Sequence, residues 1–156
     1  MLNFYYVDKS YVDFLRQFDP QVPSLEYDTH DKFFCGVVFN INSIKYYAPI
    51  SHDTKKQQTN IIIENKGQKI SSIKFSFMIP VPDNVLTKID FNEIAKTDIN
   101  YANLLRAEHK YCSSHVNDIQ AKAIAVYKIG GNSKHQLHHV CCKFKTLESI
   151  MTKFSP

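Results

Sequence analysis

The sequence lacks the patterns that carry a chain into or across a membrane. No apolar run reaches about 18 residues, the length that reads as a membrane-spanning helix, and we find no secretory signal pattern. The regular cysteine spacing of a disulfide framework is also missing, because the four cysteines lie in apolar or aromatic surroundings and two of them are adjacent. We therefore expect a cytoplasmic protein with reduced cysteines and no membrane contact.

Internal repeats and low-complexity segments are missing too, which excludes a solenoid and leaves an ordinary globular chain. The 156 residues predict one domain, 1–156. A chain of this length buries roughly 68–70% of its unfolded surface without disulfides or metal. With 44% hydrophobic residues, global disorder is excluded. The net charge of +4 is compatible with a nucleic-acid or phosphate partner.

Hydrophobic patterning predicts an α+β fold. Alternating or continuous apolar runs indicate strands, and apolar residues three to four positions apart indicate helices. The Asn42-Ser43 turn predicts a hairpin between two of these strands, and Gly36 inside the first predicts a close backbone approach. We expect strands at 3–7, 33–41, 44–49 and 73–79, a short helix at 10–18, one long helix at 101–127 and a last helix at 147–154. Residues 61–63 fit a strand or a loop.

The most informative stretch follows the strand that ends at Pro49. Proline fixes its own φ and removes a backbone donor, so we expect the strand to stop there. The residues that come next carry hydroxyl, imidazole, carboxylate and ammonium groups: Ser51, His52, Asp53, Thr54, Lys55 and Lys56. The hairpin should bring Lys32 close to Ser51. This set suits a polyanionic substrate whose reaction moves a proton, although a solvated loop between strands has the same composition.

Two groups of histidines and cysteines contain the side-chain types that bind metal ions. The first, within 135–142, comprises His135, His138, His139, Cys141 and Cys142. These ligands are crowded and lack the paired spacing of structural zinc sites. The second comprises His109, Cys112 and His115 on the predicted long helix. Residues spaced three apart point in progressively different directions around a helix, so these three side chains do not all face one ion. We predict no metal and no cofactor; a metal-dependent hydrolase that uses 135–142 would instead lose activity with a chelator.

Five segments, in register up to about Pro80, together resemble the ToxN/AbiQ toxins of type III toxin–antitoxin systems, and among them the CptN branch. The segments are Phe4-Tyr5-x-Val7-x-Lys9-x-Tyr11-x-x-Phe14-Leu15, Asp19-x-x-Val22-Pro23, Lys32-x-x-x-Gly36-Val37-Val38, Lys45-Tyr46-Tyr47-Ala48-Pro49-Ile50-Ser51 and Lys74-Phe75-x-Phe77-Met78-Ile79-Pro80. The long helix and the final segment resemble the family more weakly.

The resemblance implies a metal-independent endoribonuclease with a role in phage defence, which cleaves cellular mRNA. It implies a compact, strongly bent, mostly antiparallel β-sheet flanked by helices, one of them long and in the C-terminal half. It also implies a partner: a repeated, pseudoknotted antitoxin RNA that the toxin cuts from a precursor and that inhibits it in a closed protein–RNA assembly.

The resemblance also implies roles for individual residues. The catalytic set becomes Ser51, His52, Lys32 and Lys55, with His52 in place of the family's second hydroxyl. Because imidazole titrates near neutral pH and a hydroxyl does not, this replacement keeps a group that can move a proton. A one-residue shift in register would exchange Lys55 for Thr54. The expected RNA-binding residues are Tyr11, Tyr27, Lys45, Thr54, Lys56 and Lys74, with exposed Tyr11 and Tyr27 stacking on bases.

In that light the predicted reaction is attack by the ribose 2′-hydroxyl on the adjacent phosphate, which leaves a 2′,3′-cyclic phosphate and a 5′-hydroxyl. His52 would move protons, the two lysines of the catalytic set would stabilise charge on phosphorus, and Ser51 would position the phosphate or the 2′-oxygen. The alternative is a non-catalytic RNA-binding module whose basic hairpin end only holds phosphate.

Overall fold

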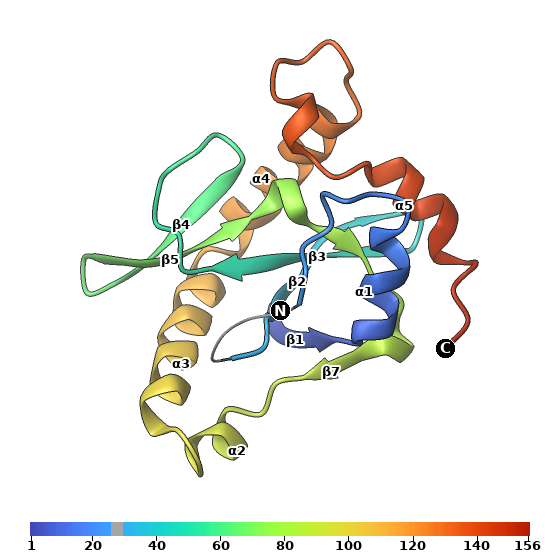
Figure 1. The fold of residues 1–156 in the computed structure, drawn as a ribbon. Helices are drawn as coiled ribbons and strands as arrows, with labels where there is room; N and C mark the ends of the chain where they lie inside the picture. The colour runs from blue at the N-terminus through green and yellow to red at the C-terminus, as the bar shows by residue number, and fades with distance from the viewer. Residues whose placement is uncertain (26–29) are drawn as a thin grey trace.

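The computed structural model describes residues 1–25 and 30–156, which form an antiparallel sheet with helices packed around it (Figure 1). In chain order the elements are β1 (Asn3–Val7), α1 (Lys9–Arg16), β2 (Phe34–Ile41), β3 (Ile44–Ser51), β4 (Asn60–Asn65), β5 (Gln68–Lys74), η1 (Phe75–Phe77), β6 (Ile79–Pro80), η2 (Asp83–Val85), β7 (Leu86–Lys88), α2 (Phe91–Ala95), α3 (Ile99–Ser114), α4 (Val116–Gly130), η3 (His138–Val140) and α5 (Phe144–Met151). The predicted α+β class is confirmed.

Strand β3 lies at the centre of the sheet, whose order is β4-β5-β3-β2-β1-β7 with β6 on β3. One edge of β3 pairs with β2, and the other pairs first with β6 and then with β5. The prediction that the strand stops at Pro49 is wrong, since β3 continues to Ser51. Pro49 falls between the pairing with β6 at Tyr47 and the pairing with β5 at Ile50, so its missing N–H removes no ladder hydrogen bond there.

The predicted β2–β3 hairpin is confirmed. Its turn residues Asn42 and Ser43 have φ of 50° and 66°, the left-handed backbone that tight two-residue hairpin turns require. Within β2, Gly36 lies under the ring of Tyr47, and a Cβ at Gly36 would be 2.1 Å from a ring carbon. The predicted close approach is therefore real, and it sets the position of β2 against β3.

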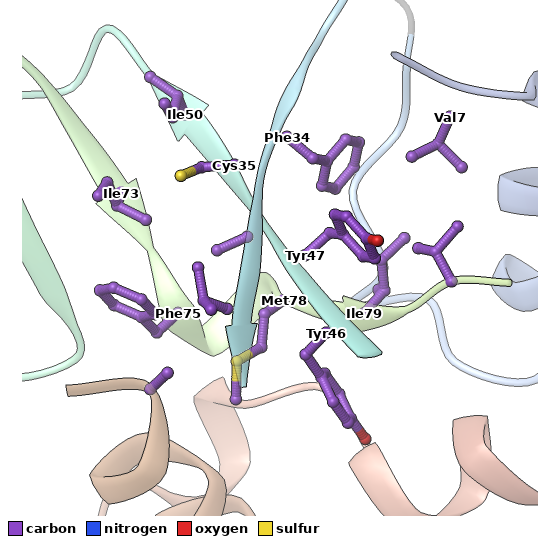
Figure 2. Packing of buried hydrophobic residues seen from close by; sticks show 14 of the residues in the cluster. Val7, Phe34, Cys35, Tyr46, Tyr47, Ile50, Ile73, Phe75, Met78 and Ile79 are labelled. Carbon is purple, nitrogen blue, oxygen red and sulfur yellow. The ribbon is translucent and has the colours of Figure 1, made fainter. Parts of the chain in front are cut away.

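The core fills the space between the sheet and the helices. Figure 2 shows buried side chains from several strands that belong to one hydrophobic cluster, among them Phe34 of β2, Tyr46 of β3, Ile73 of β5 and Met78. The hydroxyl of Tyr46 donates to the carboxylate of Glu148 on α5 at 2.6 Å, and Tyr127 of α4 donates to the same carboxylate at 2.7 Å. These bonds join the sheet to both C-terminal helices.

The predicted strand 73–79 is wrong beyond Lys74. Its alternating pattern ends in the 3-10 turn η1, which leaves Phe75 buried and Phe77 half-buried. Asn60, the first residue of β4, is paired with Lys74, so the ladder has no partner strand beyond this point. The N–H of Phe75 instead donates to Thr59 O at 3.1 Å, and Met78 and Ile79 are both buried.

The predicted single long helix is two helices, α3 and α4, which meet at His115. The N–H of His115 donates to Cys112 O at 3.1 Å, and its Nδ1 lies 2.7 Å from Tyr111 O. These bonds satisfy carbonyls at the end of α3, and the chain changes direction there. The apolar rhythm continues across the break, because Cys112 and Ile119 both face the core. Within residues 1–25 and 30–156, no helix has the length and apolar character to cross a membrane.

The predicted last helix, 147–154, begins and ends three residues earlier, as α5. The N–H of Lys143, the residue before the helix, donates to the carboxylate of Asp19 at 2.6 Å. Phe144 is buried directly after this anchor. A contact to a distant part of the chain therefore holds the residue from which α5 begins.

Helix α3 places a carboxylic acid in the core. Glu108 is 2% exposed, and its Oε1 has no hydrogen-bond partner among the described residues. Burial raises the pKa of Glu108 to about 7, and the nearby hydroxyl of Ser71 on β5 lowers it only in part. The folded protein therefore holds a proton on Glu108 at pH values where an exposed glutamate has lost it.

We expect the folded protein to lose stability as the pH rises from about 4.5 to about 7 because of Glu108. Over this interval the folded state binds more protons than the unfolded state, and above it the penalty is constant. Glu108→Gln should remove this dependence and raise the free energy of unfolding at pH 8 by roughly 1–3 kcal/mol, since each pH unit between the two pKa values corresponds to about 1.4 kcal/mol. Urea denaturation at pH 5 and pH 8, with exposed Glu93→Gln as the control, measures the effect. An equal difference between Glu108→Gln and the native protein at both pH values would contradict it.

Candidate active site

The polar stretch lies at the end of β3, where β2, β3 and β5 meet the loop 52–59. Ser51, the last residue of β3, is paired with Ser72 of β5. On the other edge, the N–H of Ile50 donates to Phe33 O at 3.3 Å. The backbone of Lys32, the residue before Phe33, therefore lies beside the end of β3, and the hairpin places it next to Ser51 as its sequence predicts.

Asp53 anchors the start of the loop. Its Oδ1 accepts the N–H of Lys55 at 2.9 Å, and its Oδ2 lies 2.8 Å from Lys74 Nζ. Its backbone oxygen accepts the hydroxyl of Ser72 at 2.6 Å. The ammonium of Lys74 and the N–H of Lys55 lower the pKa of Asp53. Sequence reasoning assigned no role to Asp53, although an aspartate that bonds the N–H two residues on is a recognisable turn former.

Asn60 anchors the end of the same loop. Its Nδ2 donates to Lys55 O at 2.9 Å, and its Oδ1 accepts the N–H of Gln57 at 3.0 Å. Asn60 is only 3% exposed, so the side chain that makes both bonds is itself shielded from water. From α4, Lys122 Nζ donates to Gln58 O at 3.2 Å. Sequence reasoning missed Asn60 as well; its position directly before Ile61-Ile62-Ile63 was the available signal.

This anchored loop presents a compact set of chemical groups. His52, Lys55 and Lys56 are exposed, while Ser51 and Thr54 are half-buried. Ser51 Oγ accepts the N–H of Asp53 at 3.2 Å, which leaves its hydroxyl hydrogen to donate outward. The arrangement can offer an imidazole for proton transfer, ammonium groups for a phosphate and one oriented hydroxyl.

The lysines that are expected to bind RNA gather at this loop only in part. Lys45 lies near the other end of β3, roughly 20 Å from Ser51 at about 3.3 Å per residue. Its Nζ is 3.3 Å from Asp83 Oδ1. Lys45 therefore does not lie beside the loop, and its role in RNA binding stays a prediction. Lys74 does lie at the loop, but it is paired with Asp53 and its side chain is 19% exposed. Its contact with RNA stays a prediction.

The expectation of an exposed Tyr11 is wrong. Tyr11 is fully buried, its hydroxyl donates to Pro80 O at 2.5 Å, and its ring meets Phe154 edge-on at 5.2 Å. It lies on the face of α1 that packs on the core, so it holds α1 to β6 instead of stacking on a base. Tyr27 lies outside the described residues.

The segment 135–142 contributes structure around η3. Cys141 and Cys142 are buried, and the N–H of Leu137 donates to His135 Nδ1 at 3.0 Å. In the part of the chain that the structure describes, histidine, cysteine and acidic side chains form no group of three or more that could hold a metal ion. On α3, His109 Nε2 lies 2.9 Å from Leu2 O, so this histidine serves packing.

Comparisons with known proteins agree with this fold. The endoribonuclease ToxN of Bacillus thuringiensis subsp. kurstaki is 28% identical over 94% of this chain and 80% of its own length. A structure from work on selective toxin inhibition by a non-coding RNA pseudoknot in bacterial type III toxin–antitoxin systems has a TM-score of 0.89, with 26% identity over 97% of this chain and 96% of that one. AbiQ, a lactococcal anti-phage endoribonuclease of the type III systems, has a TM-score of 0.85, with 23% identity over 98% and 97% of the two chains.

A family model described as toxin ToxN of the type III toxin–antitoxin systems matches residues 3–152, nearly the whole chain. The resemblance that the five sequence segments carried is therefore confirmed at the level of the family, while the CptN branch stays a prediction. This protein belongs to the ToxN family of type III toxin–antitoxin toxins.

Proposed function

We propose that this protein is an endoribonuclease toxin whose active site is the end of β3 with its anchored loop. One observation carries the proposal: Ser51 ends β3 beside the backbone of Lys32, and His52 and Lys55 follow it on a loop held in place at both ends. Relatives in the same family are named endoribonucleases. A rigid scaffold that presents polar groups on a loop is where catalysis is usually found.

The proposed reaction is transesterification within the RNA strand. The 2′-oxygen attacks the adjacent phosphorus and the bond to the 5′-oxygen breaks, which leaves a 2′,3′-cyclic phosphate and a 5′-hydroxyl. The proton of the 2′-hydroxyl is taken up by the site, and a proton is given to the leaving 5′-oxygen; the imidazole of His52 serves this transfer. The ammonium groups of Lys32 and Lys55 stabilise the charge on the phosphate oxygens, and the hydroxyl of Ser51 donates to one of them.

The partners follow from the same proposal. The substrate is cellular mRNA, and the inhibitor is a repeat-derived, pseudoknotted antitoxin RNA that the enzyme cuts from its precursor and then holds in a closed assembly. Inhibition by a non-coding RNA pseudoknot is the subject of the work on one structural relative, and another relative is an anti-phage endoribonuclease. We accordingly propose a cytoplasmic, single-domain toxin that acts in phage defence.

Product ends and chelation test the reaction. A nucleophile supplied by the substrate needs no activated water, so cleavage should proceed unchanged in excess EDTA and give 2′,3′-cyclic phosphate and 5′-hydroxyl ends. Ends are mapped by phosphatase and ligase treatment of the purified fragments. Products with 5′-phosphate and 3′-hydroxyl ends would contradict the mechanism. RNA binding without any cleavage would favour the non-catalytic RNA-binding module.

A further inference from the structure

A groove of about 660 Å³ adjoins the loop 52–59 of the candidate active site, here called the catalytic loop. It lies between the β4–β5 hairpin and the helices α3 and α4. Figure 1 shows these helices running beside β4. Lys56 and Asn60 line the groove at one end, and both belong to the loop or to the residue that anchors it. The groove is therefore continuous with the candidate active site, although none of the predicted catalytic residues lines it.

The helix wall of the groove carries a pair of parallel rings. The rings of Tyr111 and His115 lie 3.8 Å apart with an angle of 15° between their planes. Both side chains are half-buried and both line the groove. His115 stands at the break between α3 and α4, and because a carbonyl oxygen only accepts, its Nδ1 carries the hydrogen that bonds Tyr111 O at 2.7 Å. This bond holds the imidazole in place and leaves Nε2 for other contacts.

The charges of the groove are unevenly distributed. Lys69 is paired with Glu64 across the β4–β5 ladder, so that region is close to neutral. Asp118 lies on α4 in the turn after His115. Lys56 and Lys122 lie at the end next to the catalytic loop, where Lys122 donates to Gln58 O and keeps further N–H groups for other acceptors. The basic end thus adjoins the loop, and the paired rings lie about 10 Å further along, the rise of seven helical residues.

We propose that this groove binds single-stranded nucleotides that flank the cleaved bond, with a base stacked on the Tyr111–His115 pair and phosphates held by Lys56 and Lys122. Aromatic side chains beside a basic track are how proteins hold unpaired RNA, because every base offers a face for stacking. The inference rests on the proposed function, since it extends the substrate path from the same loop. In this proposal the break between α3 and α4 places His115 where it can contact RNA.

The test uses RNA that the enzyme does not cut. A fluorescently labelled 12-nucleotide oligoadenylate with 2′-O-methyl groups lacks the nucleophile, and its binding is followed by fluorescence anisotropy. We expect His115→Ala to weaken binding by roughly 5- to 100-fold, the range for one lost base stack. Lys122→Ala should lower the slope of log affinity against log salt by about 0.7, the value for one phosphate contact on a single strand. Lys128→Ala, an exposed lysine of α4 that does not line the groove, serves as the matched control.

Kinetics on a cleavable RNA separate this proposal from the proposed function. Because the groove lies away from the reacting atoms, His115→Ala should raise KM and leave kcat within about twofold. Lys122→Ala also loses its bond to Gln58 O in the loop, so it is expected to raise KM, and only its KM and its salt slope are used. Native affinity and KM in both variants would overturn the groove assignment even if cleavage is normal. If the groove variants bind RNA more weakly but the native protein cuts no RNA, the proposed nuclease function is overturned and the groove assignment is retained. Thermal melting identifies a folding defect in His115→Ala, and Lys122→Ala then decides the question alone.

Discussion

Alanine at His52 or at Ser51 is expected to slow RNA cleavage by roughly 10²- to 10⁴-fold, the range for a lost acid–base group or a lost donor to developing charge. His52 is exposed at the surface of the loop, so its replacement removes the imidazole without disturbing the core. Ser51→Ala additionally loses the bond from the N–H of Asp53, worth about 1 kcal/mol, which the other anchors of the loop tolerate.

Cleavage rates of the purified variants and toxicity in cells that lack the antitoxin RNA measure this effect. His139→Ala removes another exposed histidine, far along the chain in η3, and is the matched control for His52. Thermal melting distinguishes lost chemistry from lost structure in Ser51→Ala. Full toxicity of both the Ser51 and the His52 variants would remove these residues from the catalytic set.

Lys55→Glu is expected to abolish cleavage and also protection by the antitoxin RNA. The backbone of Lys55 is held on both sides, by Asp53 at its N–H and by Asn60 at its carbonyl, so the substitution reverses the charge while the loop keeps its anchors. If the antitoxin occupies the phosphate subsites of the substrate, a carboxylate there weakens its binding by roughly 10- to 100-fold. The salt slope should also become shallower by about 0.7–0.9 for the lost phosphate contact.

Filter binding at several salt concentrations, together with an inhibition assay on a reporter RNA, tests this expectation. Lys134→Glu reverses an exposed charge after α4 and controls for a general change in net charge. Should Lys55→Glu lose cleavage while the antitoxin binds with native affinity and salt slope, the inhibitor must lie elsewhere on the protein, and competition for the same subsites is ruled out.

The candidate site was predictable to the extent that it is local in sequence. Ser51, His52 and Lys55 lie within five positions, and one hairpin suffices to bring Lys32 beside them. The residues that hold the loop were harder to find, because Asp53 and Asn60 act through bonds that the fold creates. Asn60, for example, reaches Lys55 O only because β4 begins next to β5 and returns the chain to the loop.

Burial of single residues was the least predictable property. Tyr11 has a residue type that stacks on bases, yet it lies on the face of α1 that packs on the core, against Pro80 and Phe154. Lys45 shares a strand with Ser51, but the length of β3 separates them and Asp83 pairs with the lysine. In each case the deciding neighbour is far away in the sequence, where periodicity carries no information.

The sequence by itself determined the local features and the family. The Asn42-Ser43 turn depends on two adjacent residues, and the close approach at Gly36 is indicated by a glycine inside an apolar run. Tertiary structure alone decided that β3 changes partner near Pro49 and runs on to Ser51, and that the predicted long helix breaks at His115, whose side chain lines the groove. The physical reason is that hydrogen-bond partners along a strand edge, and the packing that turns a helix aside, are supplied by segments distant in the chain.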